Sequence, residues 1–339
     1  MRIEKSVFDK LGGTNIYSYK ISNSKNEYVK ILTLGGVINE IVVNDKNGIP
    51  ADIVCGYDSA DKYLSAEGYQ GALIGRYSNR ISNASFTLDN ETYKLFVNSG
   101  TKDSLHGGKY GFDKKIWDCT EFENEDSAGL VMSILSPDME EGYPGNLKVT
   151  VTYTFTEDCK LYINYKATTD KATPVNLTNH AYFNLDGFDG GSVMEHNLTI
   201  NGDKYIEVDE DQIPTGDPIA VKGTDFDFTS DRKITNPYDH CWMFGDYNGM
   251  IKERACMYSQ KSGRRLKVYT NMPAIQLYTA CVMTGAINFK NNVPQRRLHA
   301  ACLETQYAPD SPNRPDYPSC ILRPGEIYDF TTIFAFDTI

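Results

Sequence analysis

The stretch Leu147–Thr156 alternates apolar and polar side chains at every position. Its odd-numbered positions are all apolar, and its even-numbered positions hold one lysine and four threonines. Successive side chains of a β-strand point to opposite faces, so this pattern predicts a strand with one face on a core and one in water. After Glu157-Asp158, the residues Leu161, Ile163 and Tyr165 repeat the pattern and predict the partner strand.

Other short segments have strand character and are separated by turn residues. They are 28–34, 37–43, 51–55, 85–88, 92–95, 265–270, 275–279, 303–306 and 328–336. Asn47-Gly48 and Asp89-Asn90 lie between such segments, as in two-residue hairpins. One short helix is expected within 58–69, with Ser59 as its N-cap, and no sustained helical period occurs elsewhere. Many short strands with turn punctuation predict an all-β sandwich or barrel.

The composition narrows the class of protein. A length of 339 residues suggests about two domains, yet no linker or charge block divides the chain, so we expect one domain over residues 1–339. The formal net charge of -11 argues against a nucleic acid or an anionic membrane surface as partner. We see no signal peptide, no membrane span and no C-x-x-C among the eight cysteines, so we expect a cytoplasmic protein with reduced thiols.

The segment TPVNLTNHAYFNL, at 173–185, places His180 among asparagine amides and the aromatic pair Tyr182-Phe183. Histidine has an ordinary pKa of about 6.5 and exchanges a proton near neutral pH. His180 is therefore either a proton-transfer group or a satisfied structural histidine. Glu304, in LETQYAPDSPNRPDYPS, supplies a carboxylate that favours the first interpretation.

Four further polar stretches adjoin predicted strands. They contain Asn79 and Arg80 (GRYSNRISN), His106 (SLHGG), Asp239 (PYDHCWMF) and Gln276 (AIQLYT). Taken singly, Arg80 fits a surface ion pair, His106 and Asp239 fit turns, and Gln276 fits a half-exposed strand position. Together they supply the donors and acceptors that grip a polyhydroxyl ring.

Local motifs for metals and phosphates are missing from the sequence. None of the five histidines occurs in an H-x-H or H-E-x-x-H pattern, so no metal site is expected. No phosphate-binding Gly-x-x-x-x-Gly-Lys loop and no Gly-x-Ser-x-Gly elbow occurs either.

The combination of these stretches resembles the aldose 1-epimerase, or galactose mutarotase, family, and four blocks carry the resemblance. The blocks are GRYSNRISNASFTLDNETYKL, SLHGGKYGFDKKIWD, PVNLTNHAYFNLDG and LETQYAPDSPNRPDYPSCILRPGEIY. The resemblance implies a large antiparallel β-sandwich of the galactose mutarotase type, with few short helices and the sugar site in a cleft on one face. It implies that Glu304 is the general base and His180 the general acid. By the same matching, the residues that hold sugar hydroxyls are Asn79, Arg80, His106, Asp239 and Gln276.

The implied reaction needs no cofactor and acts on a free aldohexose such as galactose or glucose, in a monomer or homodimer. A base takes the O1 proton, an acid gives a proton to O5, and the opened chain rotates about C1–C2 before it closes. Glu304 close by is expected to keep His180 charged. Ala181 and Ala274 depart from the usual family pattern and put sugar preference in doubt, and His299 has no expected role beyond a possible contact behind the site.

Three alternatives remain open on sequence alone. A glycoside hydrolase would use Glu304 and Asp239 as paired carboxylates, which leaves His180 without a role. A carbohydrate-binding protein would keep the aromatics and hydrogen-bonding groups without an acid–base pair. An epimerase of sugar phosphates would need more cations than Arg80.

Overall fold

The alternating stretch Leu147–Thr156 forms β13 in the computed structural model, which describes residues 1–283 and 285–339. Its five apolar side chains are at most 1% exposed, while the alternate side chains face outward. The partner β14 (Lys160–Thr169) pairs antiparallel with it, Leu147 lying opposite Thr169. The predicted half-buried hairpin is thus confirmed.

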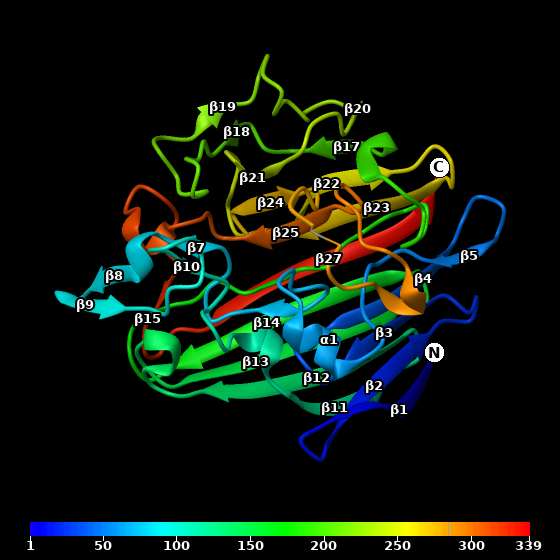
Figure 1. Cartoon of the computed structure of the whole chain (residues 1–339), viewed down its shortest axis with the longest axis horizontal. Helices are drawn as coiled ribbons and strands as arrows, with labels where there is room; N and C mark the ends of the chain where they lie inside the picture. Colours follow the sequence, from blue (N-terminus) through cyan, green and yellow to red (C-terminus); the bar gives the residue numbers. More distant parts are fainter. Residues whose placement is uncertain (284) are drawn as a thin grey trace.

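The hairpin belongs to an antiparallel nine-stranded sheet that crosses the molecule (Figure 1). Its strand order is β11-β12-β13-β14-β27-β23-β22-β17-β20. The remaining strands are β11 (Asp118–Glu123), β12 (Ser127–Ser136), β27 (Tyr328–Thr338), β23 (Arg264–Thr270), β22 (Lys252–Tyr258), β17 (Asn197–Ile200) and β20 (Arg232–Lys233). The C-terminal strand β27 therefore joins the hairpin to strands from the second half of the chain.

Two smaller antiparallel sheets have five strands each. The N-terminal sheet contains β1 (Arg2–Leu11), β2 (Thr14–Ser22), β3 (Tyr28–Leu32), β4 (Ile38–Asn44) and β5 (Pro50–Asp52). The second sheet has the order β19 (Ile219–Ala220), β18 (Lys204–Tyr205), β21 (Asp239–Met243), β24 (Ala274–Tyr278) and β25 (Cys302–Gln306).

Short strand pairs and turns complete the framework. The pairs are β6 (Leu73–Ile74) with β16 (Thr178–Asn179), β7 (Arg80–Ile81) with β10 (Ser104–Leu105), β8 (Ser85–Leu88) with β9 (Glu91–Lys94), and β15 (Thr173–Pro174) with β26 (Ile321–Leu322). The 3₁₀ turns are η1 (Ser82–Ala84), η2 (Phe112–Lys114), η3 (Glu140–Gly142), η4 (Val193–Glu195), η5 (Lys290–Asn292) and η6 (Ser311–Asn313).

One α-helix, α1 (Ala60–Ser65), occurs in the described part of the chain. The Ser59 hydroxyl accepts a hydrogen bond from the backbone N–H of Lys62, as the predicted N-cap requires. None of the described helices has the length and apolarity needed to cross a bilayer.

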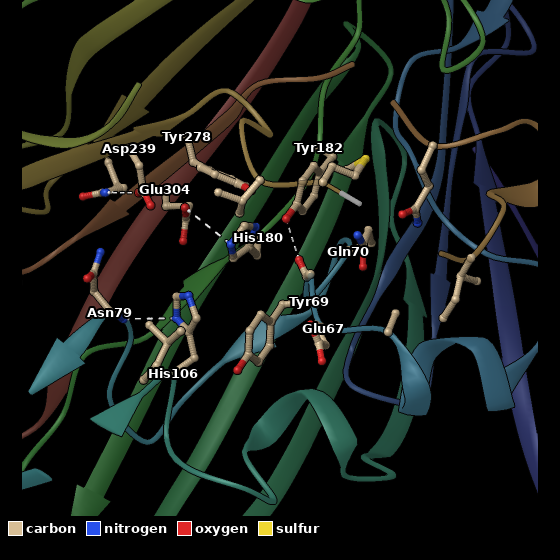
Figure 2. Close-up of a pocket in the computed structure, with 18 of the residues that line it drawn as sticks. Glu67, Tyr69, Gln70, Asn79, His106, His180, Tyr182, Asp239, Tyr278 and Glu304 are labelled. Carbon is tan, nitrogen blue, oxygen red and sulfur yellow. Dashed lines mark hydrogen bonds and ion pairs between the residues drawn. The ribbon is translucent and has the colours of Figure 1, made fainter. Parts of the chain in front are cut away.

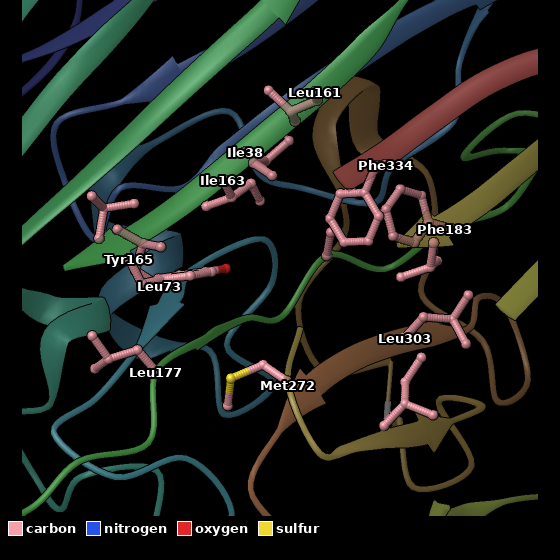
Figure 3. Close-up of a cluster of buried hydrophobic side chains, with 14 of the residues drawn as sticks. Ile38, Leu73, Leu161, Ile163, Tyr165, Leu177, Phe183, Met272, Leu303 and Phe334 are labelled. Carbon is pink, nitrogen blue, oxygen red and sulfur yellow. The ribbon is translucent and has the colours of Figure 1, made fainter. Parts of the chain in front are cut away.

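The main core lies between the large sheet and the smaller ones. Phe183 and Phe334 meet edge to face there, with ring centroids 5.1 Å apart (Figure 3). Leu303 of β25 packs into the same core. Because side chains alternate along a strand, the neighbouring Glu304 points to the opposite side of β25. Core packing thus determines which face of β25 carries the carboxylate.

The expectation of an all-β fold with few short helices is confirmed. Several strands escaped prediction, among them β1, β2, β11, β12 and β22. In β12 the inward residues Ala128, Leu130 and Met132 are buried, but the outward positions carry Val131 and Leu135, which are apolar and exposed, so polar residues do not alternate with apolar ones. The period-two signal is weak in such a segment.

Candidate active site

A pocket of about 370 Å³ opens beside β24 and β25. Such a volume suits a small ligand, since binding pockets commonly measure about 300–1,000 Å³. All seven residues singled out from the sequence line it: Asn79, Arg80, His106, His180, Asp239, Gln276 and Glu304. Figure 2 shows several of these side chains converging from different strands. The fold therefore brings residues from all parts of the chain to one place.

Strand register places three of the seven side by side. Gln276 of β24 lies directly opposite Glu304 of β25. Ile275 and Leu277 pack into the core, so Gln276 between them faces the pocket. Asp239 begins the next strand, β21, and its Oδ1 accepts a 2.7 Å hydrogen bond from Gln276 Nε2. An amide and two carboxylates therefore form one wall.

Two residues with left-handed backbone conformations form a second wall of the pocket. Asn79 and His106 have φ values of +64° and +52° and lie directly before β7 and directly after β10. The Asn79 backbone N–H donates to His106 Nδ1 at 3.1 Å, and the His106 N–H donates to the Asn79 carbonyl at 3.2 Å. These reciprocal bonds fix the imidazole ring at the pocket edge. Arg80 follows directly and also lines the pocket.

His180 follows β16 and is tied to the segment before β6. Its backbone N–H donates to the Ala72 carbonyl, and its carbonyl accepts from the Gly71 N–H, both at 2.9 Å. Because β16 lies against β25, His180 Nε2 comes within 3.6 Å of Glu304 Oε1. The two side chains are only 6% and 2% exposed. An imidazole and a carboxyl group thus face one buried space.

Tyrosine rings surround the His180 ring. Tyr182 stacks on it at 5.0 Å with an interplanar angle of 14°, and Tyr278 approaches edge-on at 6.1 Å. Tyr69 lies 6.1 Å away on a nearly parallel plane and meets His106 at 4.7 Å. The Tyr182 hydroxyl donates to the Gly68 carbonyl at 2.7 Å. The rings restrict His180 to one orientation and offer apolar faces to a ligand.

Unpaired polar atoms gather in this pocket. Among the described residues, five of its lining side chains carry a buried atom without a hydrogen-bond partner: Gln70 Oε1, Arg80 Nε, His180 Nδ1, Gln276 Oε1 and Glu304 Oε2. A buried polar group normally has a partner, because leaving it unpaired costs about 1–3 kcal/mol. This arrangement is suited to a ligand rich in hydroxyl groups.

Comparison with known proteins agrees with this geometry. Residues 17–335 match the sequence model of the family described as aldose 1-epimerase. Galactose mutarotase from Homo sapiens is 39% identical over 346 aligned positions, which cover 98% of each chain. Aldose 1-epimerase from Escherichia coli K12 is 36% identical over 335 positions, covering 94% of this chain and 95% of that protein.

The chain belongs to the aldose 1-epimerase family. It is an isomerase that interconverts the α and β anomers of aldoses.

Solved structures place it in the same fold. Galactose 1-epimerase from Lactobacillus acidophilus superposes with a TM-score of 0.86 at 25% identity, covering 99% of both chains. An aldose epimerase homologue from C. elegans superposes with a TM-score of 0.87 at 29% identity, covering 94% of this chain and 98% of that one. The predicted β-sandwich of the mutarotase type is confirmed.

Burial sets the protonation of the epimerase pocket. Burial lowers the pKa of His180 to about 4. Burial, reinforced by the charge of Asp239, raises the pKa of Glu304 well above its ordinary value, and Arg80 only partly opposes this. The expectation that Glu304 keeps His180 charged is therefore wrong for the ligand-free pocket. Desolvation outweighs the ion pair, because burial shifts the pKa of each group towards its uncharged form.

His106 is held neutral and in one tautomer. Burial and the nearby His180 and Arg80 lower its pKa well below 6.5. Its Nδ1 accepts the Asn79 N–H, so the ring proton of the neutral form lies on Nε2. His106, His180 and Glu304 form a cluster with potential metal-ligand atoms within 4.8 Å of one another. In this tautomer, however, His106 offers an N–H where a metal needs a lone pair.

The environments of these residues differ from the surface ion pair, the turns and the half-exposed strand position that each residue fits when taken singly. Gln276 is 3% exposed and Asp239 is on a strand with an amide partner. Arg80 forms no ion pair among the described residues, and its Nε lies buried and unpaired. His106 adjoins a turn but its ring faces the pocket.

The departures from the family pattern lie behind the site. Ala181 and Ala274 are buried and do not line the pocket. His299 is 2% exposed, and its Nε2 lies 2.7 Å from the Phe188 carbonyl. Its contact with the backbone indicates that His299 has a structural role behind the site.

Sequence reasoning missed several lining residues, including Tyr69, Gln70 and Tyr278. Tyr182 was noted only as an apolar neighbour of His180. Its spacing of two from His180 was the one available signal, because side chains at i and i+2 of an extended segment share a face.

Proposed function

We propose that this aldose 1-epimerase opens and recloses the ring of a free aldohexose, with Glu304 as the general base and His180 as the general acid. The observation that supports this most is the convergence of two buried groups, Nε2 of His180 and Oε1 of Glu304, at 3.6 Å in a pocket of hexose dimensions. Proton-transfer catalysis requires both groups within reach of one substrate.

In the proposed cycle, a carboxylate oxygen of Glu304 takes the O1 proton while the C1–O1 bond becomes a carbonyl. The C1–O5 bond breaks, its electron pair goes to O5, and His180 gives O5 a proton. Rotation about C1–C2 turns the other carbonyl face towards O5. Closure returns the O5 proton to His180 and the Glu304 proton to O1, so the enzyme ends unchanged.

The ionised form of the pair must arise when sugar binds. Glu304 Oε2 has no partner among the described residues. Hydroxyl groups that donate to this oxygen favour the carboxylate, and the proton of the pair then moves to His180. No further proton is needed, because the ionised and the neutral forms of the His180–Glu304 pair each hold one proton.

The same proposal assigns hydroxyl recognition to five residues. Asp239 and Gln276 bind from one wall, Asn79 and Arg80 from the other, and His106 donates through Nε2–H. Unpaired atoms on Arg80 and Gln276 support this assignment.

Polarimetry on freshly dissolved α-galactose and α-glucose tests the proposal. We expect both to reach their anomeric equilibrium faster with protein than with buffer, and a panel of aldoses then gives the preference. A parallel assay for sugar release from disaccharides addresses the hydrolase alternative, for which no product is expected. Binding of these sugars without faster mutarotation would reject the proposal.

We further propose that the protein acts in the cytoplasm in hexose metabolism, as a single domain that is a monomer or homodimer. The eight free cysteines are in keeping with a reducing compartment. Light scattering after gel filtration measures the oligomeric state.

A further inference from the structure

Gln70 is a buried amide that the proposed cycle does not use. It lines the active-site pocket and is 3% exposed. Its Oε1 is buried without a hydrogen-bond partner among residues 1–283 and 285–339. Glutamine is seldom buried unless its amide is bound, so this acceptor requires an explanation.

The backbone around Gln70 is held in place on both sides. Gly68 accepts the Tyr182 hydroxyl at 2.7 Å, and Gly71 donates to the His180 carbonyl at 2.9 Å. The amide itself packs against Gly68, where a Cβ would lie 2.3 Å from Gln70 Nε2. A glycine at this position therefore makes room for the amide beside the catalytic histidine.

The position of Gln70 relates it to one part of the sugar. In Figure 2, Asp239 and Glu304 lie on one side of His180, and Gln70 lies on the other. In the proposed cycle O1 faces Glu304 and O5 faces His180. The ring atom beyond O5 is C5, which carries the exocyclic C6 hydroxymethyl group.

We propose that Gln70 determines specificity by binding the C6 hydroxyl of an aldohexose. This inference rests on the proposed function, because the direction of the ring follows from the roles of Glu304 and His180. A C6 hydroxyl donates to the free Oε1 or accepts from Nε2. A 6-deoxyhexose or an aldopentose leaves the amide unpaired, and a buried site built for a hydroxyl rejects an analogue without one.

The test compares galactose with 6-deoxygalactose, which differs only by the C6 oxygen. For the wild-type protein we expect kcat/KM to be roughly three- to tenfold lower with 6-deoxygalactose, as for the loss of one neutral hydrogen bond. Gln70→Met keeps the length of the side chain and removes its polar atoms. This variant should turn over both sugars equally, because galactose alone loses the contact.

Gln276→Met is the matched control, the same change on the wall that carries Glu304 and Asp239. It should lower kcat/KM for both sugars by the same factor and keep the wild-type preference for galactose. Thermal unfolding supplies a second readout. Gln70→Met should not lower Tm, since it removes an unpaired acceptor, whereas a structural amide would lower Tm on removal.

Three results would overturn the inference. They are equal kcat/KM for the two sugars with wild type, an undiminished galactose preference in Gln70→Met, and a fall in Tm with the preference intact. If wild type accelerated neither sugar, the proposed function itself would fail, which is a different outcome from active protein without a C6 preference.

Discussion

Two neighbouring cavities share the side chain of Tyr57 and differ in how their polar groups are paired. The second cavity, of about 310 Å³, contains ion pairs of Lys30 with Glu40 and of Lys290 with Asp52. None of its lining side chains has a buried unpaired atom within the described chain, whereas five of those in the active-site pocket do. The paired charges of the second cavity stabilise the fold, and the unpaired polar atoms of the active-site pocket remain available to substrate.

The pocket differs from the second cavity in another respect. Burial shifts the pKa values of its acid–base groups, His180 and Glu304, towards their uncharged forms. In the second cavity each charge has an opposite charge beside it. The comparison teaches that buried polarity alone does not identify a site, and that several unpaired polar atoms facing one cavity are the more informative feature.

The largest expected effect is on turnover. His180→Gln removes the proposed acid, so kcat should fall by about 10²–10⁴-fold. Tm should fall only slightly, because the stack on Tyr182 is lost but His180 Nδ1 has no hydrogen-bond partner to lose among the described residues. Polarimetry and thermal unfolding measure the two quantities. A loss of Tm in step with activity would remove the contrast between the cavities.

The reverse pattern is expected in the second cavity. Lys290→Met leaves Asp52 buried without its cation, and unfolding free energy should fall by about 3–5 kcal/mol. Denaturant titration measures this loss, and kcat of the folded protein should be unchanged. The double variant with Asp52→Asn should be more stable than Lys290→Met alone, because no charge then lacks a partner. Equal stability of the two would argue against a structural ion pair.

The pH dependence of kcat/KM should reflect the proton that His180 and Glu304 share, and this distinguishes the active-site pocket from the second cavity. Between the pKa of His180 at about 4 and the raised pKa of Glu304, the pair holds one proton. The reacting form also holds one, so kcat/KM should be level in this window. It should fall below pH about 4, where a second proton binds. It should fall again at high pH, where the last proton leaves Glu304.

Measurement of kcat/KM between acid and alkaline pH, corrected for spontaneous mutarotation, tests this profile. An acid limb near the ordinary histidine pKa of about 6.5 would show that burial does not control the pair. The ion pairs of the second cavity should not contribute, so Lys290→Met should leave the profile in place.

The smallest effect concerns the ring that orients His180. Tyr182→Phe keeps the stacked ring and removes the bond to the Gly68 carbonyl, so kcat/KM should fall only about two- to fivefold. Tyr182→Leu also removes the stack and should cost more. If both variants turned over galactose equally well, the ring plane would have no part in orienting the acid.

Much of the framework was accessible from sequence because its signals are local. The alternation of Leu147–Thr156, the Ser59 cap and the hairpin turns all depend on residues close together in the chain. Strands β1 and β12 lacked such a signal, since the first is largely exposed and the second carries apolar side chains on both faces.

The site was accessible only in part. The seven residues singled out from the sequence all line one pocket. Gln70 and Tyr69 were missed, because an unpaired amide or a ring beside two histidines is defined by distant neighbours. The charge of His180 was predicted wrongly for the same reason: its burial depends on Tyr69, Tyr182 and Tyr278, which only the fold assembles.

The most direct test of the acid–base pair is mutarotation of α-galactose by Glu304→Gln. The amide keeps the size of the side chain but cannot take the O1 proton. We predict that kcat falls by about 10²–10⁴-fold while Tm does not decrease. Near-normal turnover by this folded variant would contradict the account.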